Sequence, residues 1–376
     1  MSWPGQWVES RLGVSFQRVG GEDARALAGL ALRRNPRRAH LVVSTVLGKH
    51  IPAPPSSIAG ASGRLAALVR ALPGLGDAVA VVAFAETATA LGHLVASGIP
   101  GAYNLNSTRA PGPALAEFSE VHSHAAAHYL RPRDPGPLAI ATTIVLVDDE
   151  LTTGRTALAA IDALLPHTAC RDFVLAALID SRSPAERAPE VPAGVTLRSV
   201  ALADLRLELP ADLPERAAPL LSVAQATPVA GGGPARTVQV DARGTVDGRH
   251  GFSAEQRDEL VDLADSIAGL VDATGPLSVI GTEEFMALPL LVAQALERAG
   301  RDVVFGSSTR SPAIVIDEPG YALRTMIAFE TGAGQRYLYN VQPDRGAVVI
   351  TDCPQPGLTA AVTGLGVDCL VIEVQA

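Results

Sequence analysis

The sequence is poor in several residue types, and each shortage argues against a class of protein. It has only 3 cysteines, an odd number without a C-x-x-C pair, which favours a reducing cytoplasm over a disulfide-stabilised scaffold. Basic residues are fewer than acidic ones, and the net charge of −9 argues against general nucleic-acid binding. The sequence lacks a signal-peptide pattern at its start and any uncharged apolar run of the roughly 18 residues that a membrane span needs. We therefore expect a cytoplasmic protein without nucleic-acid or membrane partners.

Lysine is the scarcest charged residue, because Lys49 is the single lysine and every other basic residue is arginine. Arginine carries a planar fork, whereas lysine carries a compact ammonium whose pKa can fall on burial. Lys49 and His50 follow an apolar stretch, and His50 is a candidate base. The pair is therefore a candidate functional pair, and a surface turn is the alternative.

Short β-branched runs alternate with Ala/Leu-rich runs along the chain, which is typical of a mostly parallel α/β sheet. Predicted strands cover 40–47, 78–84, 101–106, 143–148, 172–179 and 195–202. Predicted helices cover 57–72, 87–97, 119–130, 154–165 and 254–271. A segment rich in Pro and Ala that ends in GGG predicts a linker over 209–240, between domains at 1–208 and 241–376.

The segment IVLVDDELTTGRTALAAI (144–161) combines a buried strand, two adjacent carboxylates and a Thr/Gly turn that opens a helix. Amides, hydroxyls and the helix dipole over Thr152–Thr156 would form an anion-binding nest. Asp148 and Asp149 could hold a diol, directly or through a divalent ion. Since ligands bind at the carboxyl ends of such strands, the segment predicts a site for a phosphorylated sugar. An ordinary strand, turn and helix with a solvated acidic end is the alternative.

This segment resembles the PRPP-binding signature of type I phosphoribosyltransferases, in which an acidic pair precedes a T-T-G-x-T loop. The resemblance implies that Asp148 and Asp149 orient the ribose hydroxyls, with Mg²⁺ held directly or through water. It also implies that the loop binds the 5′-phosphate of PRPP. The loop residues are Thr152, Thr153, Gly154, Arg155 and Thr156.

A second turn, AETAT, follows the predicted strand 78–84, at the position of the pyrophosphate loop in these enzymes. The resemblance implies that five residues there line pyrophosphate: Ala85, Glu86, Thr87, Ala88 and Thr89. Glu86 could instead coordinate magnesium or face the helix dipole. Arg109 offers a fork for pyrophosphate oxygens, with a surface arginine before a turn as the alternative.

The segment EFSEVHSHAAAHYL (117–130) contains Glu120, His122, His124 and His128. As a helix it would place Glu120, His124 and His128 along one stripe. In type I enzymes a mobile loop closes over the reacting centre at this position, so a lid that faces the substrate or acceptor is favoured. A zinc pair and a solvated helix face are the alternatives.

These motifs, with STVLGKHIP and SSTRSP (307–312), resemble the phosphoribosyltransferase-like family of bacterial tellurium-resistance and stress operons. In that family a TRSP domain follows the transferase domain. The resemblance implies a Rossmann-like parallel sheet with a hood over the acceptor, and it places Lys49 and His50 on the acceptor side or near a phosphate. We expect a homodimer that transfers ribose 5-phosphate from Mg-PRPP to a small, unidentified acceptor. A non-catalytic PRPP or nucleotide sensor and an assembly component are the alternatives.

The second half aligns with the first as a diverged repeat. Blocks in the same order pair Glu86 with Glu283, Arg109 with Arg310, and Asp149 with Asp352. Thr351 replaces the counterpart of Asp148, and Pro356 removes an amide donor from the loop. We therefore do not expect this copy to bind PRPP in the usual way. It would bind an acceptor or effector, or pack against the first domain, and Arg310 would cradle an anion or belong to a plain turn.

Overall fold

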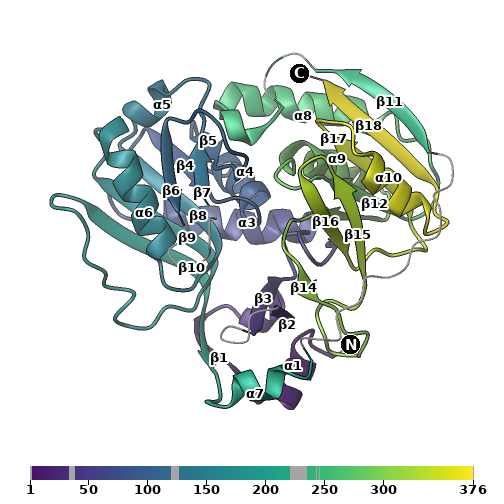
Figure 1. Ribbon diagram of the computed structural model, residues 1–376. Coiled ribbons are helices and arrows are strands. Elements are labelled where there is room, and N and C mark those ends of the chain that lie inside the picture. Colours follow the sequence, from purple (N-terminus) through teal and green to yellow (C-terminus); the bar gives the residue numbers. More distant parts are fainter. Residues whose placement is uncertain are drawn as a thin grey trace.

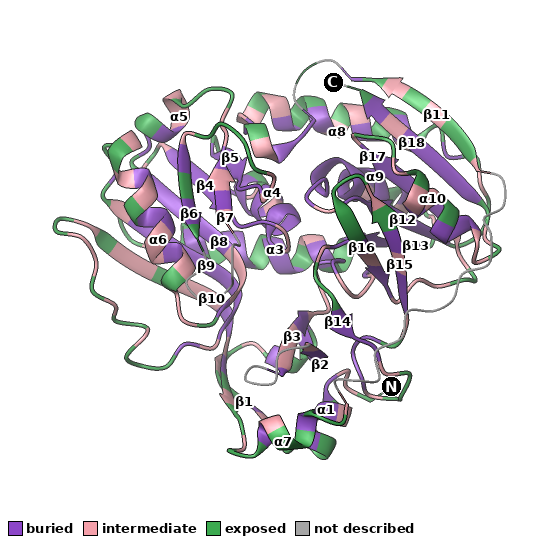
Figure 2. Ribbon diagram, viewed as in Figure 1, coloured by how far each residue is buried: buried purple, intermediate pink, exposed green. Residues whose placement is uncertain are grey.

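The computed structural model describes residues 2–33, 39–119, 127–220, 235–242, 244 and 246–375. Two lobes, each with its own parallel sheet and covering helices, lie side by side, and a small sheet lies below them in Figure 1. Strand interiors and the helix faces that cover them are buried (Figure 2). The N-terminal and C-terminal parts of the chain meet both between the lobes and in the small sheet.

The first lobe contains a sheet with the strand order β1-β10-β9-β8-β4-β5. Its strands are β1 (Ser15–Gly21), β4 (Val79–Ala83), β5 (Tyr103–Asn106), β8 (Thr143–Leu151), β9 (Asp172–Asp180) and β10 (Thr196–Glu208). All neighbours are parallel except the antiparallel edge pair β1–β10. The central strand β4 is buried throughout, as expected for a parallel strand covered on both faces.

Helices cover both faces of this sheet. The cores place α3 and α4 on one face and α6 on the other. Helices of this N-terminal part are α1 (Gln6–Leu12), α2 (Ala24–Leu27), α3 (Pro55–Arg70), α4 (Thr89–Ser97), α5 (Gly136–Ala139), α6 (Arg155–Leu164) and α7 (Leu213–Ala217), with a 3₁₀ turn at Leu165–His167.

The second lobe contains a parallel sheet with the order β11-β18-β17-β12-β13. Its strands are β11 (Arg236–Asp241), β12 (Leu277–Gly281), β13 (Val303–Ser307), β17 (Gly346–Thr351) and β18 (Cys369–Gln375). Helices α8 (Ala254–Ala268) and α9 (Ala287–Arg298) pack on one face, after a 3₁₀ turn at Gly248–His250. Helix α10 (Pro356–Thr363) packs on the other face with the hairpin β15 (Met326–Thr331) and β16 (Gly334–Tyr339).

The two lobes repeat one chain order. The order in the first lobe is β4, α4, β5, an antiparallel strand pair, β8, α6 and β9. The order in the second lobe is β12, α9, β13, a hairpin, β17, α10 and β18. The four shared strands also have the same spatial order, β5-β4-β8-β9 and β13-β12-β17-β18. The topology therefore confirms the repeat that the motif blocks indicated.

The small sheet combines the N-terminal and C-terminal parts of the chain. Strand β2 (Ala28–Arg33) lies between β3 (His40–Ser44) and β14 (Ala313–Ile314). The Tyr321 hydroxyl accepts a hydrogen bond from the Leu32 N–H and donates one to the Ile314 carbonyl, each 2.8 Å long. These bonds and the shared core tie the region before the first lobe to the second half.

The predicted helix over 119–130 is wrong. Strands β6 (Ala116–Ser119) and β7 (Ala127–Leu130) pair antiparallel there, and burial alternates along each of them. That alternation has the period of a strand, because Phe118, His128 and Leu130 all point to the core. Residues 120–126, and with them Glu120, His122 and His124, lie outside the described residues.

The predicted linker, 209–240, is partly structured. Helix α7 lies within it and β11 begins within it, and residues 221–234 lie outside the described residues. The domain boundaries at 208 and 241 remain predictions.

Candidate functional site

The predicted phosphate-binding loop connects β8 to α6. Residues 143–147 are buried, and the strand continues through the half-buried Asp148 and Asp149 to Leu151. Asp148 Oδ1 accepts a hydrogen bond of 2.9 Å from the Asp149 N–H. Gly154 has φ +75°, a left-handed conformation that suits glycine, and α6 begins at the next residue. Two carboxylates therefore lie next to a helix start whose amides and threonines can receive an anion.

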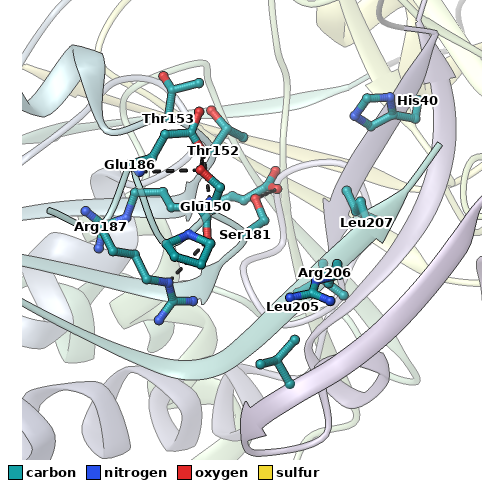
Figure 3. A pocket seen from close by; sticks show the side chains of 14 residues that line it. His40, Glu150, Thr152, Thr153, Ser181, Glu186, Arg187, Leu205, Arg206 and Leu207 are labelled. Atoms are coloured by element: carbon teal, nitrogen blue, oxygen red, sulfur yellow. Dashed lines mark hydrogen bonds between the residues drawn. The ribbon is translucent and has the colours of Figure 1, made fainter. Parts of the chain in front are cut away.

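A cavity of about 660 Å³ opens beside this loop (Figure 3). The end of β8 and the loop form one wall, the segment after β9 forms a second, and β10 lies opposite with His40. The residues that line it are Val19, His40, Glu150, Thr152, Thr153, Ser181, Arg182, Ser183, Pro184, Glu186, Arg187, Leu205, Arg206 and Leu207. The cavity is thus polar near the threonines and partly apolar along β10.

Charged groups of both signs face this cavity. Ser183 donates from its N–H (2.8 Å) and its hydroxyl (2.7 Å) to Glu186 Oε2, and these bonds lower the pKa of Glu186. Ser181 Oγ donates to Glu150 Oε1 at 2.7 Å. The buried Arg182 pairs with Asp180 over 2.8 Å. The wall is therefore held by these hydrogen bonds and the Arg182–Asp180 ion pair, and it offers the Glu186 carboxylate next to arginine donors.

The predicted pyrophosphate loop, residues 85–89, follows the neighbouring strand β4. The Phe84 N–H donates to the Val147 carbonyl (3.0 Å), so the loop starts beside the acidic pair of β8. The Ala85–Glu86 peptide bond is cis. The Ala85 N–H donates to Ser107 Oγ (2.9 Å), and Ser107 Oγ lies 2.9 Å from His128 Nδ1.

His128 supports this loop from within the core. Only 1% of the His128 surface is exposed, and its ring stacks on that of Phe118 with the ring centroids 4.8 Å apart. Because its imidazole contacts Ser107, which in turn holds the Ala85 amide, His128 connects β7 to the start of the loop.

Lys49 lies buried between the two halves of the chain, with 3% of its surface exposed. Its ammonium donates to the carbonyls of Glu283 (2.6 Å) and Ser308 (2.8 Å) and lies 3.3 Å from Glu86 Oε2. Burial lowers the pKa of Lys49, and the nearby Glu86 carboxylate opposes that shift. A compact ammonium with three donors matches these three acceptors, which a planar guanidinium does not. The surface-turn alternative for Lys49 is therefore wrong.

His50 lies next to Lys49, with its ring centroid 5.5 Å from that of Tyr339. Burial lowers the pKa of His50 to about 4, and the Lys49 charge acts in the same direction. His50 is consequently neutral near pH 7. Neither Lys49 nor His50 is among the residues that line the 660 Å³ cavity, so their assignment to the acceptor side remains a prediction.

Two Ser-Thr-Arg loops meet glutamates of the opposite half. Thr108 Oγ1 (2.6 Å) and the Arg109 N–H (2.8 Å) donate to the Glu284 carboxylate. Thr309 Oγ1 (2.9 Å) and the Arg310 N–H (3.3 Å) donate to Glu86 Oε2. Burial raises the pKa of Glu284, although the Arg310 charge and the two donors from the first half oppose this shift. In contrast, the charges of Lys49 and Arg310 lower the pKa of Glu86.

These contacts correct the predicted pairing of Glu86 with Glu283. The Ala85 N–H donates to Ser107 Oγ (2.9 Å), and the Glu283 N–H donates to Ser308 Oγ (3.1 Å), so Glu283 corresponds to Ala85. The counterpart of Glu86 is therefore Glu284. The predicted alignment of this block was therefore out of register by one residue.

A second cavity of about 390 Å³ lies at the corresponding edge of the second sheet. Its residues are Arg249, Thr282, Glu283, Glu284, Phe285, Arg310, Glu330, Thr331, Gly332, Ala333, Arg336, Asp352, Cys353, Pro354, Gln355 and Pro356. Arg310 Nε and Arg336 Nε both bind Glu283, at 2.5 and 2.7 Å, and Arg249 pairs with Asp352. The three predicted residues of this half, Glu283, Arg310 and Asp352, therefore share one cavity.

The structure also brings predicted residues together at the edge of the first sheet and between the halves. Thr152 and Thr153 line the first cavity, and the 85–89 loop begins beside Asp148 in the adjacent strand. Lys49, Glu86 and Arg310 meet between the halves. Sequence reasoning missed Glu284, His40 and the 181–187 segment, although the repeated Ser-Thr-Arg motif was a usable signal for Glu284.

No cluster of three or more His, Cys, Asp or Glu side chains suited to a metal ion occurs in the described ranges. In the same ranges, no helix is both long and apolar enough to cross a membrane.

Comparisons with known proteins match both halves of the chain. Residues 27–204 match the model of a family described as phosphoribosyl transferase, and residues 246–366 match the TRSP domain described as C-terminal to it. A comparison with curated proteins found no match. The fold class expected from the sequence, a Rossmann-like parallel sheet followed by a second α/β domain, is confirmed.

Solved structures similar to the chain include three phosphoribosyltransferases. The APRTase from Giardia lamblia complexed with 9-deazaadenine has 19% identity and a TM-score of 0.30, covering 42% of this chain and 83% of its own. The adenine phosphoribosyltransferase from Rhodothermus marinus has 19% identity and a TM-score of 0.28, and the match covers 39% of this chain and 80% of that enzyme. The hypoxanthine phosphoribosyltransferase from Staphylococcus aureus has 13% identity and a TM-score of 0.24, and the match covers 42% of this chain and 79% of that enzyme.

Proposed function

We propose that this chain, which belongs to the family of phosphoribosyl transferases with a C-terminal TRSP domain, transfers ribose 5-phosphate from Mg-PRPP to a small acceptor. One observation carries the proposal: the threonine loop after the acidic pair of β8 forms a wall of a 660 Å³ cavity. A phosphate bound on the loop would leave the sugar beside the carboxylates, with the rest of the cavity for the acceptor.

Each part of PRPP has a proposed partner. The Thr152–Thr156 loop binds the 5′-phosphate through amides and hydroxyls at the start of α6. Asp148 and Asp149 orient the ribose hydroxyls. The 85–89 loop and Arg109 bind pyrophosphate, which leaves from the carbon that the acceptor attacks.

Mg²⁺ enters this scheme as part of the substrate. Mg²⁺ is commonly held by one or two carboxylates together with substrate phosphates. The half-buried Asp148 and Asp149 are such a pair, so they would hold the ion beside the ribose. When bound, the ion neutralises charge on the leaving pyrophosphate.

In the reaction the C1–O bond of PRPP breaks and its electron pair leaves with pyrophosphate. A lone pair of the acceptor forms the new bond to C1, and the acceptor loses its proton to a base or to water. The transition state is expected to resemble an oxocarbenium ion, so the protein acts by positioning the reactants and stabilising the leaving group. Arg109 stabilises the charge on pyrophosphate.

We place the acceptor in the cavity between the 181–187 segment and β10. Glu186 is ionised there and can accept hydrogen bonds from an N–H group, while Arg187 can donate. Leu205 and Leu207 offer apolar contact to a flat ring or an aliphatic part. These groups favour a small acceptor with both polar and apolar surface.

Incubation of the full chain with PRPP, Mg²⁺ and a panel of bases, amines and small acids tests the proposal. Pyrophosphate release with a ribosylated product seen by mass spectrometry would support it, and Asp149→Asn would abolish both. Asp302→Asn, at an exposed ion pair of the other lobe, is the matched control and should retain turnover. PRPP binding without turnover across the panel would indicate the sensor alternative instead.

A further inference from the structure

Glu284 belongs to the second half, yet its carboxylate binds a loop of the transferase half. Its residue is 3% exposed, Oε2 accepts from Thr108 Oγ1 (2.6 Å), and Oε1 accepts from the Arg109 N–H (2.8 Å). The two donors are adjacent in sequence, and the second belongs to the arginine proposed to bind pyrophosphate. One carboxylate thus fixes a side chain and a backbone amide of this loop together.

The other side of this loop is also held. The N–H and C=O groups of Thr108 pair with those of Tyr129 in β7, both at 2.9 Å. Thr108 Oγ1 additionally accepts from the Ala110 N–H at 3.1 Å. The loop therefore lies between a strand of its own lobe and a carboxylate of the opposite lobe.

The same arrangement occurs with the halves exchanged. Glu86 accepts from Thr309 Oγ1 and from the Arg310 N–H, and Thr309 pairs with Tyr337 as Thr108 pairs with Tyr129. The segment before each lobe's long helix also crosses over: Ala53 pairs with Phe305, and Phe252 pairs with Asn104. Contacts that recur in both directions are those of a two-fold interface between like subunits.

We infer that the C-terminal half completes the transferase site by supplying Glu284 as a positioning residue for the Arg109 loop. This inference rests on the proposed function, since it assigns Arg109 to pyrophosphate. Glu284 does not touch the substrate. It acts through the Arg109 backbone, so its loss should disturb the step in which pyrophosphate leaves more than the binding of the acceptor.

Hydrogen exchange on the full chain tests the contact itself. Glu284→Ala removes both acceptors, and we expect amide exchange in residues 107–111 to become at least tenfold faster. Glu284→Gln keeps one acceptor for the Arg109 N–H. Its exchange rate in residues 107–111 should therefore lie between those of the wild type and Glu284→Ala. Glu86→Ala is the matched variant, because it should speed exchange in 308–312 and leave 107–111 unchanged.

Kinetics test the functional part of the inference. We expect Glu284→Ala to lower kcat about 10- to 100-fold with the KM of the acceptor nearly unchanged, and Glu284→Gln to restore part of the loss. Glu259→Ala, an exposed acid of the same half on α8, should match the wild type. If Glu284→Ala does not fold, Thr108→Val removes one of the two bonds from the first half and should also slow kcat, by a smaller factor.

The outcomes separate this inference from the proposed function. If the wild type turns over PRPP and neither Glu284→Ala nor Thr108→Val is slower than Glu259→Ala, the inference is overturned and the transferase proposal stands. If the wild type neither binds nor turns over PRPP, the transferase proposal fails and the positioning role of Glu284 in that reaction fails with it. If Glu284→Ala loses kcat as expected but amide exchange in residues 107–111 is unchanged, positioning of the Arg109 loop is not the cause of the loss and the inference is also overturned.

Discussion

The ammonium of Lys49 and the carboxylate of Glu86 form a buried ion pair, with Nζ 3.3 Å from Oε2. Lys49 precedes the first lobe and Glu86 follows its strand β4, and the Lys49 ammonium also donates to two carbonyls of the second half. The Lys49 side chain therefore connects three parts of the chain: the segment before the first lobe, the predicted pyrophosphate loop and the second half.

Replacement of Lys49 should destabilise the protein. Lys49→Met leaves two carbonyls and a buried carboxylate without this donor, and we expect the free energy of unfolding to fall by about 3 kcal/mol. Lys49→Arg should also be destabilising, because a planar fork does not match the three acceptors. Urea denaturation measures both, with Arg298→Met as the control at an exposed ion pair. A loss in Lys49→Met no larger than in Arg298→Met would contradict the assignment.

Acid should destabilise the fold through His93, which is 1% exposed and lies on α4. Burial lowers the pKa of His93 to about 3 from 6.5, with the Arg257 charge contributing. Between these values the unfolded chain binds a proton that the folded chain does not, so stability falls as the pH falls through this window. Each pH unit costs about 1.4 kcal/mol at most, so a shift from pH 7 to pH 4.5 should cost about 2–3 kcal/mol from this residue.

His93→Leu should remove that part of the acid sensitivity. His50 contributes in the same direction, since its pKa is lowered to about 4. Urea midpoints at the two pH values measure the difference, with the partly exposed His167→Leu as control. An equal pH dependence in His93→Leu and the wild type would refute this explanation.

Gly154→Ala should impair turnover far more than stability. A side chain at φ +75° strains the backbone by about 1 kcal/mol and distorts the loop proposed to bind the 5′-phosphate. Gly74→Ala is a matched control, with φ +72° and nothing within 4 Å of an added Cβ. Thermal shifts of the two variants should agree, while PRPP turnover falls tenfold or more only in Gly154→Ala.

The halves should remain associated after the chain is cut between them. A protease site placed within 221–234 would leave the shared core, the β2–β14 pair and the Glu86 and Glu284 contacts in place. Size-exclusion chromatography should then show one species that contains both pieces. Separate elution would mean that these contacts are too weak to hold the halves, and the measured size also tests the predicted homodimer.

Sequence patterns predicted the repeating α/β elements well because buried parallel strands are apolar and short, and helices between them are longer. The helix over 119–130 was wrong for a reason that the pattern contains. Glu120, His124 and His128 have helical spacing, yet His128 and Leu130 are also two residues apart, as on one face of a strand, and a short segment fits both periods. Packing of His128 on Phe118 favours the strand.

The contacts that shape the candidate site were harder to predict. The Glu283 carbonyl that receives the Lys49 ammonium is 234 positions away, and no local pattern encodes such a distance. The scarcity of lysine indicated that Lys49 was unusual, but it did not identify the partners. The Glu86 counterpart was missed by one residue, although the turns after β4 and β12 have the same length. Glu283 stands next to Glu284 in the sequence, so an alignment shifted by one residue still pairs Glu86 with a glutamate.

The reciprocal contacts also affect how the protein responds to mutation. In a pair of identical subunits every substitution occurs twice, once on each side of the symmetry axis. Here the two sides are encoded separately, so Thr351 can replace an acidic residue in one half while Asp148 is kept in the other. A single gene change therefore alters one side of the interface alone, and the two sides can be varied independently in the laboratory.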